Sequence, residues 1–330
     1  MDETPPADLQ LTIVDAHTHL ASLDYIPLPF IEGVARNVAA SLAARGMGVA
    51  APRLVDRFLG SLQDPEGVQQ IVEMEAAGVS RAVLLIADLT WVFQGGRLTL
   101  EEIFLAHRRV AERHPGRFVV FGGVDPRWGS DGLDLFERSV IEWGFAGLKL
   151  YPPCGYSPSD ERLFPFYEIC AQRGLPVLLH TGPTSPSLSF AFSSPFHVDE
   201  AARCFPGVNF ILAHGAVHHV EEAVMLCEYR PNVFMDLSGL QGKLAVERDT
   251  GYYHHVFHRG LSHKILFGTD WPLFRLQADP KDFLQELLGP GGALADLPEP
   301  DLGLIFSRNL ERLLPAGARA SAEPAVVTER

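Results

Sequence analysis

Several residues that can bind a metal ion or carry a proton stand directly after short apolar runs of this sequence. They are His17, His19, Lys149, His180, His214 and Asp270. Short, continuously apolar runs are typical of buried strands in a parallel sheet. In a barrel of parallel strands, the residues at the carboxyl ends of the strands meet on one face and form the active site. Their shared position therefore predicts one site, whereas no single one of them would predict it.

His17 and His19 belong to the segment Asp15-Ala-His-Thr-His. Residues two apart in a strand point to the same side, so both imidazoles are expected to face one point. Imidazole nitrogens are common ligands of zinc and related metals. Taken alone, the pair is more often two ordinary histidines that hydrogen-bond to backbone, and the histidines further along the chain change that interpretation.

His180 and His214 each close an apolar run, and a buried imidazole must satisfy both of its nitrogens. One such residue is more often a core histidine, but two of them after a His-x-His segment favour metal ligands. Asp270 follows Phe267-Gly-Thr. A carboxylate there can bind a metal and accept a proton from metal-bound water. The alternative for Asp270 is a helix N-cap or a turn residue.

Lys149 is unusual because it stands inside an apolar run of a chain with few lysines. The lysines are Lys149, Lys243, Lys264 and Lys281. As an ammonium, Lys149 could attract a substrate carboxylate or pair with a neighbouring acid. Tyr151, Trp271 and Arg275 fall in segments after strands, where a pocket wall would lie. Together with Lys149 they predict a small, aromatic or apolar substrate that bears a carboxylate, although such aromatics often only pack.

The elements that must position these residues alternate between strand and helix. The expected strands are 11–16, 82–87, 118–124, 146–151, 176–180, 208–214, 233–236 and 265–268. The expected helices are 65–77, 100–113, 133–143, 162–173, 198–204, 217–229 and 252–259, with a final helix at 302–314. Continuously apolar strands that alternate with helices predict the α/β class and a (β/α)8 TIM barrel. A doubly wound sheet is the alternative, but the histidine segment occupies the place of its Gly-rich phosphate turn.

A long segment, residues 20–67, separates the first two expected strands and contains helical patterns at 31–45 and 53–62. This helical insertion after strand 1 predicts a lid or a contact in a homo-oligomer, and a merely decorative helix pair is the alternative. We expect one domain over residues 1–314. Residues 315–330 lack apolar periodicity and predict a disordered tail.

Composition narrows the class of protein. The chain has 330 residues, 47% of them hydrophobic, and a formal net charge of −14. Nucleic-acid binding needs basic clusters, and the sequence has none. No apolar run approaches the ~18 residues of a membrane span, and the acidic N-terminal residues do not resemble a signal peptide. The four cysteines form no CxxC motif, so we expect reduced thiols in a cytoplasmic protein.

The segments around the candidate residues resemble the amidohydrolase superfamily, in its amidohydrolase-related branch. The matching segments are Val14-Asp-Ala-His-Thr-His19, Gly147-Leu-Lys-Leu-Tyr-Pro152, Leu179-His-Thr-Gly182, Leu212-Ala-His-Gly215 and Phe267-Gly-Thr-Asp-Trp-Pro272. The resemblance spans nearly the whole expected barrel.

The resemblance implies a divalent metal, most often zinc, held by His17, His19, His180 and Asp270. His214 would be a further ligand or an electrophilic helper. In binuclear members a lysine at the place of Lys149 carries a carboxylate adduct that bridges two metals, so the site is expected to hold one or two ions. An ammonium cannot bind a cation, whereas a lysine carbamate can.

Two reaction classes follow from the resemblance. The first is a hydrolase that cleaves an amide, ester or lactone of a small molecule with metal-activated water, Asp270 serving as the base. The second is a non-oxidative decarboxylase or hydratase that acts on an aromatic or ring-cleavage acid with one metal. A catalytically silent binding protein is a third class, although none of the motif positions is replaced.

Overall fold

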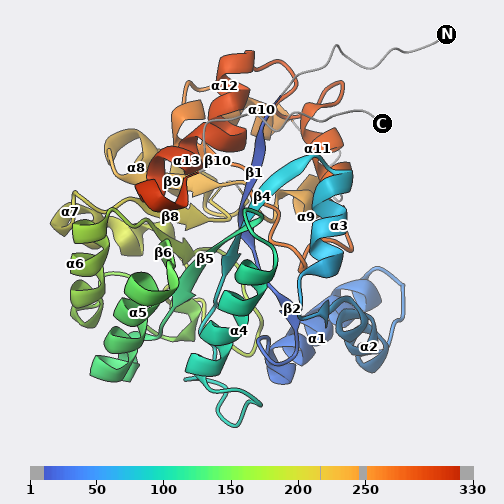
Figure 1. Ribbon diagram of the computed structural model, residues 1–330. Coiled ribbons are helices and arrows are strands. Elements are labelled where there is room, and N and C mark those ends of the chain that lie inside the picture. The colour runs from blue at the N-terminus through green and yellow to red at the C-terminus, as the bar shows by residue number, and fades with distance from the viewer. Residues whose placement is uncertain (1–10, 216, 245–250, 320–330) are drawn as a thin grey trace, which may run out of the picture.

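Eight parallel strands form one curved sheet in the computed structural model, which describes residues 11–215, 217–244 and 251–319 (Figure 1). In spatial order they are β1 (Ile13–Thr18), β4 (Val79–Leu85), β5 (Phe118–Gly123), β6 (Gly147–Leu150), β7 (Val177–His180), β8 (Phe210–Ala213), β9 (Val233–Asp236) and β10 (Ile265–Leu266). Each strand pairs in parallel with the next one along the chain. This order is that of a barrel, because a doubly wound sheet would reverse its strand order in the middle.

Backbone contacts between the two outer strands bring the barrel close to full closure. The amide of Ala16 donates to the carbonyl of Phe267 over 2.9 Å, and Thr18 forms a parallel bridge with Trp271. The amide of Asp270 also donates to the carbonyl of His17 over 2.7 Å. The (β/α)8 prediction is thereby confirmed, and the first and last candidate segments lie side by side.

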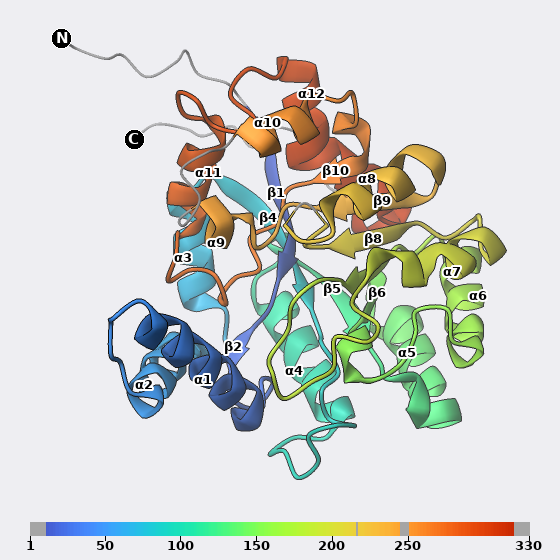
Figure 2. The same cartoon turned by 180° about the vertical axis from the view of Figure 1, so that it is seen from behind.

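Helices surround the strands and supply the outer layer (Figure 2). They are α3 (Val68–Ala76), α4 (Leu100–Arg113), α5 (Gly129–Trp143), α6 (Phe164–Arg173), α7 (Asp199–Cys204), α8 (Val220–Tyr229), α9 (Leu240–Leu244), α10 (Gly251–Phe257), α11 (Pro280–Leu288), α12 (Glu299–Gly303) and α13 (Asn309–Leu313). Local sequence sets several ends: Thr99 and Glu102 form a capping box before α4. Gly144 and Gly174 end α5 and α6 at φ of 71° and 64°, a left-handed conformation that glycine adopts without strain.

The insertion after β1 contains two helices, as predicted. They are α1 (Leu28–Ala44) and α2 (Ala51–Ser61), each with a proline in its first turn, where the missing N–H costs no hydrogen bond. The short strands β2 (Ala21–Ser22) and β3 (Gln63–Asp64) pair antiparallel and join the two ends of the insertion. The helix pair lies outside the ring of barrel helices, on the side toward which β1 runs (Figure 1).

Two apolar layers hold the barrel together. A smaller cluster of alternate strand residues, including Val14, Val83, Phe121 and Ile211, packs inside the sheet. A larger cluster packs between the outer face of the strands and the helices. Burial on both faces explains why the strands read as continuous apolar runs.

The C-terminal segment differs in part from its prediction. Ala316–Ala318 form a 3-10 turn, and the guanidinium of Arg81 donates to the carbonyl of Ala318 over 2.6 Å. The first residues of the expected tail are therefore attached to the barrel, and residues 320–330 lie outside the described part of the chain. No helix in the described part is long and apolar enough to cross a membrane. The single-domain extent of residues 1–314 stays a prediction.

Candidate metal centre

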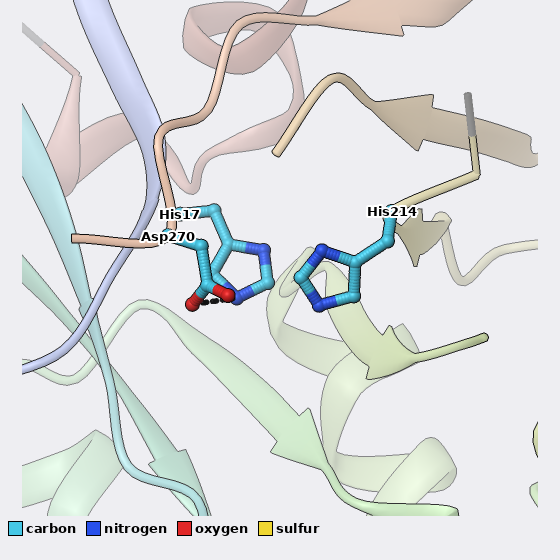
Figure 3. A group of neighbouring side chains, drawn as sticks. All are labelled: His17, His214 and Asp270. Atoms are coloured by element: carbon cyan, nitrogen blue, oxygen red, sulfur yellow. Dashed lines mark ion pairs between the residues drawn. The ribbon is translucent and has the colours of Figure 1, made fainter. Parts of the chain in front are cut away.

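The candidate residues all stand at the carboxyl end of the barrel. Lys149 lies in β6, His17 in β1 and His180 at the end of β7. His19 and His214 directly follow β1 and β8, and Asp270 stands four residues after the end of β10. Ligand atoms of His17, His214 and Asp270 all lie within 4.8 Å of one another, and all three residues are buried. Figure 3 shows their side chains converging from three separate segments of the barrel. The structure thus brings residues more than 250 positions apart in the sequence to one point.

Asp270 connects this group to His19. Its Oδ1 atom lies 3.5 Å from Nε2 of His17 and 3.3 Å from Nε2 of His19. Among the described residues, no hydrogen-bond donor is aligned with this buried oxygen. A buried carboxylate oxygen without a hydrogen bond is costly, so its surroundings indicate a missing cation partner.

His17 and His19 each direct one ring nitrogen to that oxygen and use the other as a donor. Nδ1 of His17 donates to Oδ2 of Asp236 over 2.9 Å, and Nδ1 of His19 donates to the carbonyl of Leu85 over 2.7 Å. Because a carboxylate and a carbonyl only accept, both Nδ1 atoms carry the proton. Both Nε2 atoms are then free to offer a lone pair in the neutral ring, which is the form that binds a metal.

His180 and His214 repeat this arrangement on the opposite side. Nε2 of His180 donates to the carbonyl of Pro183 over 3.0 Å, and Nδ1 of His214 donates to the carbonyl of Ser238 over 3.0 Å. The two remaining nitrogens, Nδ1 of His180 and Nε2 of His214, lie 3.2 Å apart. Four imidazole lone pairs and one carboxylate oxygen therefore face the centre, and this donor set fits a divalent metal.

Burial keeps the imidazoles in the form that can ligate. Burial, with repulsion from Lys149, holds the pKa of His17 well below its usual range. Burial, with repulsion from His214, does the same to the pKa of His180. The net pKa of Asp270 is lowered: burial raises it, but His17 and His19 outweigh burial. Neutral rings around an ionised carboxylate are the state that a metal requires.

Lys149 lies against the same group. Its Nζ atom lies 3.4 Å from Nε2 of His17, and the side chain is buried. Burial lowers the pKa of Lys149 to about 8, partly offset by Asp270 and Asp236. A substantial fraction of neutral amine is thus present near neutral to mildly basic pH, and only the neutral amine can take up carbon dioxide as a carbamate.

Asp236 and Ser238 hold two of the histidines and were not singled out by the sequence analysis. Besides binding His17, Asp236 accepts the amide of His214 over 3.0 Å through Oδ1. Ser238 Oγ lies 3.0 Å from Nδ1 of His17 and 2.8 Å from Nδ1 of His214, and it donates to Asp236. Asp236 ends an apolar strand, so the rule that selected the other candidates would also have selected it.

Asp15 ties the first and last strands together behind the centre. Its Oδ1 accepts hydrogen bonds from the amides of His17 and Thr269 at 3.0 Å each, and its Oδ2 accepts one from the hydroxyl of Thr269 at 2.6 Å.

The backbone is strained at two of the candidate residues. His214 and Asp270 adopt φ of 57° and 53°, the left-handed region that residues other than glycine seldom occupy. Such strain at two candidate residues is typical of functional sites.

A cavity of about 370 Å³ opens onto this centre. Tyr151, His180, His214 and Asp270 line its inner end, and α1 and α2 of the insertion supply much of its wall. The Tyr151 ring stacks on His180 with centroids 4.4 Å apart, and its hydroxyl lies 3.0 Å from Oγ1 of Thr184. The insertion therefore lines the cavity beside the metal centre, and its role as a lid stays a prediction.

Trp271 and Arg275 point elsewhere. The Trp271 ring is buried and donates through Nε1 to Glu73 of α3 over 2.8 Å. Arg275 pairs with the same Glu73 and lies 5.7 Å from the centre of the Trp271 ring. Neither residue is among those that line the cavity. The structure brings Tyr151 to the cavity and Lys149 to the metal centre, but it does not bring Trp271 or Arg275 there.

Comparison with known proteins gives one family and a set of similar folds. A family model described as amidohydrolase matches residues 14–316. An uncharacterized TIM-barrel protein from Bordetella bronchiseptica is 21% identical, with a TM-score of 0.65 over 92% of this chain and 98% of that one. A 5-carboxyvanillate decarboxylase from Novosphingobium aromaticivorans, solved with manganese, is 13% identical, with a TM-score of 0.63 over 93% and 96%. A 4-oxalomesaconate hydratase from Rhodopseudomonas palustris is 15% identical, with a TM-score of 0.58 over 92% and 95%.

The fluG protein of Emericella nidulans is 26% identical over 103 residues, which is 31% of this chain. The chain matches only 12% of the length of that curated relative. The three solved structures named here are each below 25% identity and establish the barrel fold. The family model covers every residue that supplies the metal centre.

Proposed function

This chain belongs to the amidohydrolase family, and we propose that it is a metal-dependent carboxy-lyase that decarboxylates a small aromatic or ring-cleavage acid. Hydrolysis of an amide, ester or lactone, which the sequence analysis placed first, becomes the competing reaction. Two of the similar structures named above are a decarboxylase and a hydratase of organic acids. Their names support the class of reaction and not a particular substrate.

The chemistry of the cavity carries the proposal. Its inner end consists of His180, His214 and Asp270, and most of its wall is apolar. A carboxylate that enters finds a charged partner at the metal centre and little polar surface elsewhere. Loss of carbon dioxide followed by protonation of the carbon gives two products without the carboxylate charge, which suits an apolar site, whereas hydrolysis needs water there.

The metal would be held by His17, His19, His180, His214 and Asp270, and when bound it would anchor the carboxylate and withdraw electrons from the acid. We propose one ion. Zinc suits several imidazoles with one carboxylate, and manganese is named with the Novosphingobium decarboxylase. The activity test below therefore uses both zinc and manganese.

Side chains of this protein would contact the substrate and transfer the proton. When the bond to the carboxylate breaks, its electron pair stays on the carbon, which must then take up a proton. Asp270 lines the cavity and is ionised, so we assign it the relay of a proton, which it first accepts from solvent and then passes to that carbon. Tyr151 stacks on His180 at that wall, and α1 with α2 supplies much of the apolar surface that would contact the body of the substrate.

The test is a product analysis on protein loaded separately with zinc and manganese. Hydroxybenzoates and unsaturated dicarboxylic acids are assayed for carbon dioxide, and parallel panels of amides, esters and lactones are assayed for hydrolysis. Release of carbon dioxide with loss of one carbon from an acid supports the proposal. Hydrolysis without carbon dioxide release would overturn it, and binding without any turnover would indicate a silent binding protein.

A further inference from the structure

If the substrate is an acid, as proposed above, the cavity wall decides which acids can enter. The apolar wall residues are Phe30, Ile31, Val34 and Val38 of α1, Phe58 of α2, the adjoining Leu62, and Leu273 and Phe274 after β10. Most polar wall residues away from the metal centre are uncharged amides or hydroxyls, namely Asn37, Ser61, Thr184, Ser185 and Gln277, and one further wall residue, His218, is an imidazole. Within the described part of the chain, no arginine or lysine lines the cavity.

The basic residues of the insertion face away from the cavity. Arg36 stands two positions after Val34 on α1, and residues two apart do not share a helix face. Its side chain is 63% exposed and lies 4.0 Å from Glu32. The other arginines of the insertion, Arg45, Arg53 and Arg57, are also exposed. None of these four arginines is among the residues that line the cavity.

Two further cationic side chains near the cavity, those of Arg275 and Lys149, contact other groups. Arg275 follows Phe274 in sequence, but its guanidinium is paired with Glu73 and lies over the Trp271 ring. Lys149 is buried at the metal centre, 3.4 Å from His17, so it adds to the charge at the inner end only. Positive charge is therefore concentrated at one end of the cavity.

From this distribution we infer that the protein takes acids with a single carboxylate on an apolar or aromatic body and discriminates against a second carboxylate. This step rests on the proposed function. The first carboxylate reaches the cationic inner end. A second one would be held among apolar side chains without a cation, and an unpaired buried charge strongly opposes binding.

Binding measurements test the inference without requiring turnover. Isothermal titration of zinc- or manganese-loaded protein compares 2-hydroxybenzoate with 4-hydroxyisophthalate, which adds a second carboxylate, and with 5-carbamoyl-2-hydroxybenzoate, which replaces that carboxylate by a neutral amide of similar shape. We expect the monoacid and the amide to bind with similar affinity and the diacid to bind at least about tenfold more weakly.

A charge added to the wall provides the reciprocal test. Val34→Arg should recover most of the lost affinity for the diacid, whereas Val34→Gln, which is polar but neutral, should not. Val38→Arg with Val38→Gln serves the same purpose if the first pair does not give a cooperative thermal transition. Diacid binding that is gained in the arginine variant, but not in the glutamine variant at the same position, supports the inference.

The outcomes separate this inference from the proposed function. Equal binding of diacid and amide by the unmodified protein would overturn the inference and leave the carboxy-lyase proposal standing. Failure of all three compounds to bind would count against an acid substrate and would overturn both.

Discussion

Nε2 of His214 faces Nδ1 of His180 at 3.2 Å, and neither nitrogen can donate a hydrogen bond to the other. Each ring already donates through its second nitrogen to a backbone carbonyl, that of Ser238 or Pro183. Two neutral lone pairs at this distance repel each other unless a cation is shared between them. Nε2 of His17 and Nε2 of His19 likewise direct lone pairs toward Oδ1 of Asp270, and a bound cation would relieve that repulsion too. The predictions about metal binding follow from these contacts.

Removal of metal should destabilise the protein. Dialysis against a chelator should lower Tm by several degrees, because a metal present at about 100 times its Kd stabilises the native state by about 2.7 kcal/mol. Zinc or manganese should restore Tm, measured by calorimetry. His17→Ala should abolish this response, and His254→Ala, a half-exposed histidine paired with Asp296, should retain it. A metal response unchanged in His17→Ala would contradict the assigned centre.

Asp236→Asn should weaken metal binding by about tenfold to a hundredfold, as is usual when the group that orients a ligand histidine is lost. Asp236 accepts from the His17 ring, the His214 amide and Ser238 at once, and an amide cannot serve all three equally. Competition with a metallochromic chelator measures the affinity. Asp64→Asn is the matched control, since Asp64 is buried but accepts from the amides of Val68 and Gln70. Equal metal affinity in both variants would remove Asp236 from the centre.

Asp270→Asn should lower kcat by about a hundredfold to ten-thousandfold, the usual contribution of a positioned acid or base. The variant should keep much of its metal, because four imidazoles remain. Asparagine tolerates the left-handed φ of 53° at this position, so the backbone should hold. Steady-state rates are compared alongside metal content and Tm. Near-normal turnover in this variant would exclude Asp270 as the proton-transfer group.

One metal per chain is expected, with Lys149 unmodified. Lys149→Met should leave the metal content, measured by elemental analysis, at one ion per chain. Protein prepared with ¹³C-bicarbonate should show no carbamate carbon by NMR. Two ions that fall to one in Lys149→Met would instead indicate a carbamate bridge and would favour hydrolysis.

Metal-stripped protein should become more stable as pH rises from about 8 toward 10.5. The buried Lys149 has its pKa lowered from 10.5 to about 8, so in this window the unfolded chain holds a proton that the native state has lost. The contribution is at most about 1.4 kcal/mol per pH unit, and below pH 8 the full penalty applies. Urea unfolding across this range measures it. Lys149→Met should lack this rise, and Lys281→Met, at an exposed position, should keep it.

The barrel and the location of its site could be predicted from sequence because both depend on local signals. An apolar run such as 177–180 reads as a buried strand wherever it occurs, and His180 at its end is marked by position alone. Parallel strands of a barrel then bring their carboxyl ends together irrespective of the length and sequence of the loops. The insertion was recognisable for the same reason, since its helices α1 and α2 have their own apolar periodicity.

What each side chain contacts was decided only by the tertiary structure. His17 and Asp236 are 219 residues apart, and their hydrogen bond exists because the closed barrel places β1 near β9. The partners of each ring determine which nitrogen faces the centre, and no local pattern encodes a partner. Arg275 illustrates the same limit: its sequence position suggested a pocket wall, but it lies in a turn where its guanidinium pairs with Glu73 of α3 and points away from the cavity.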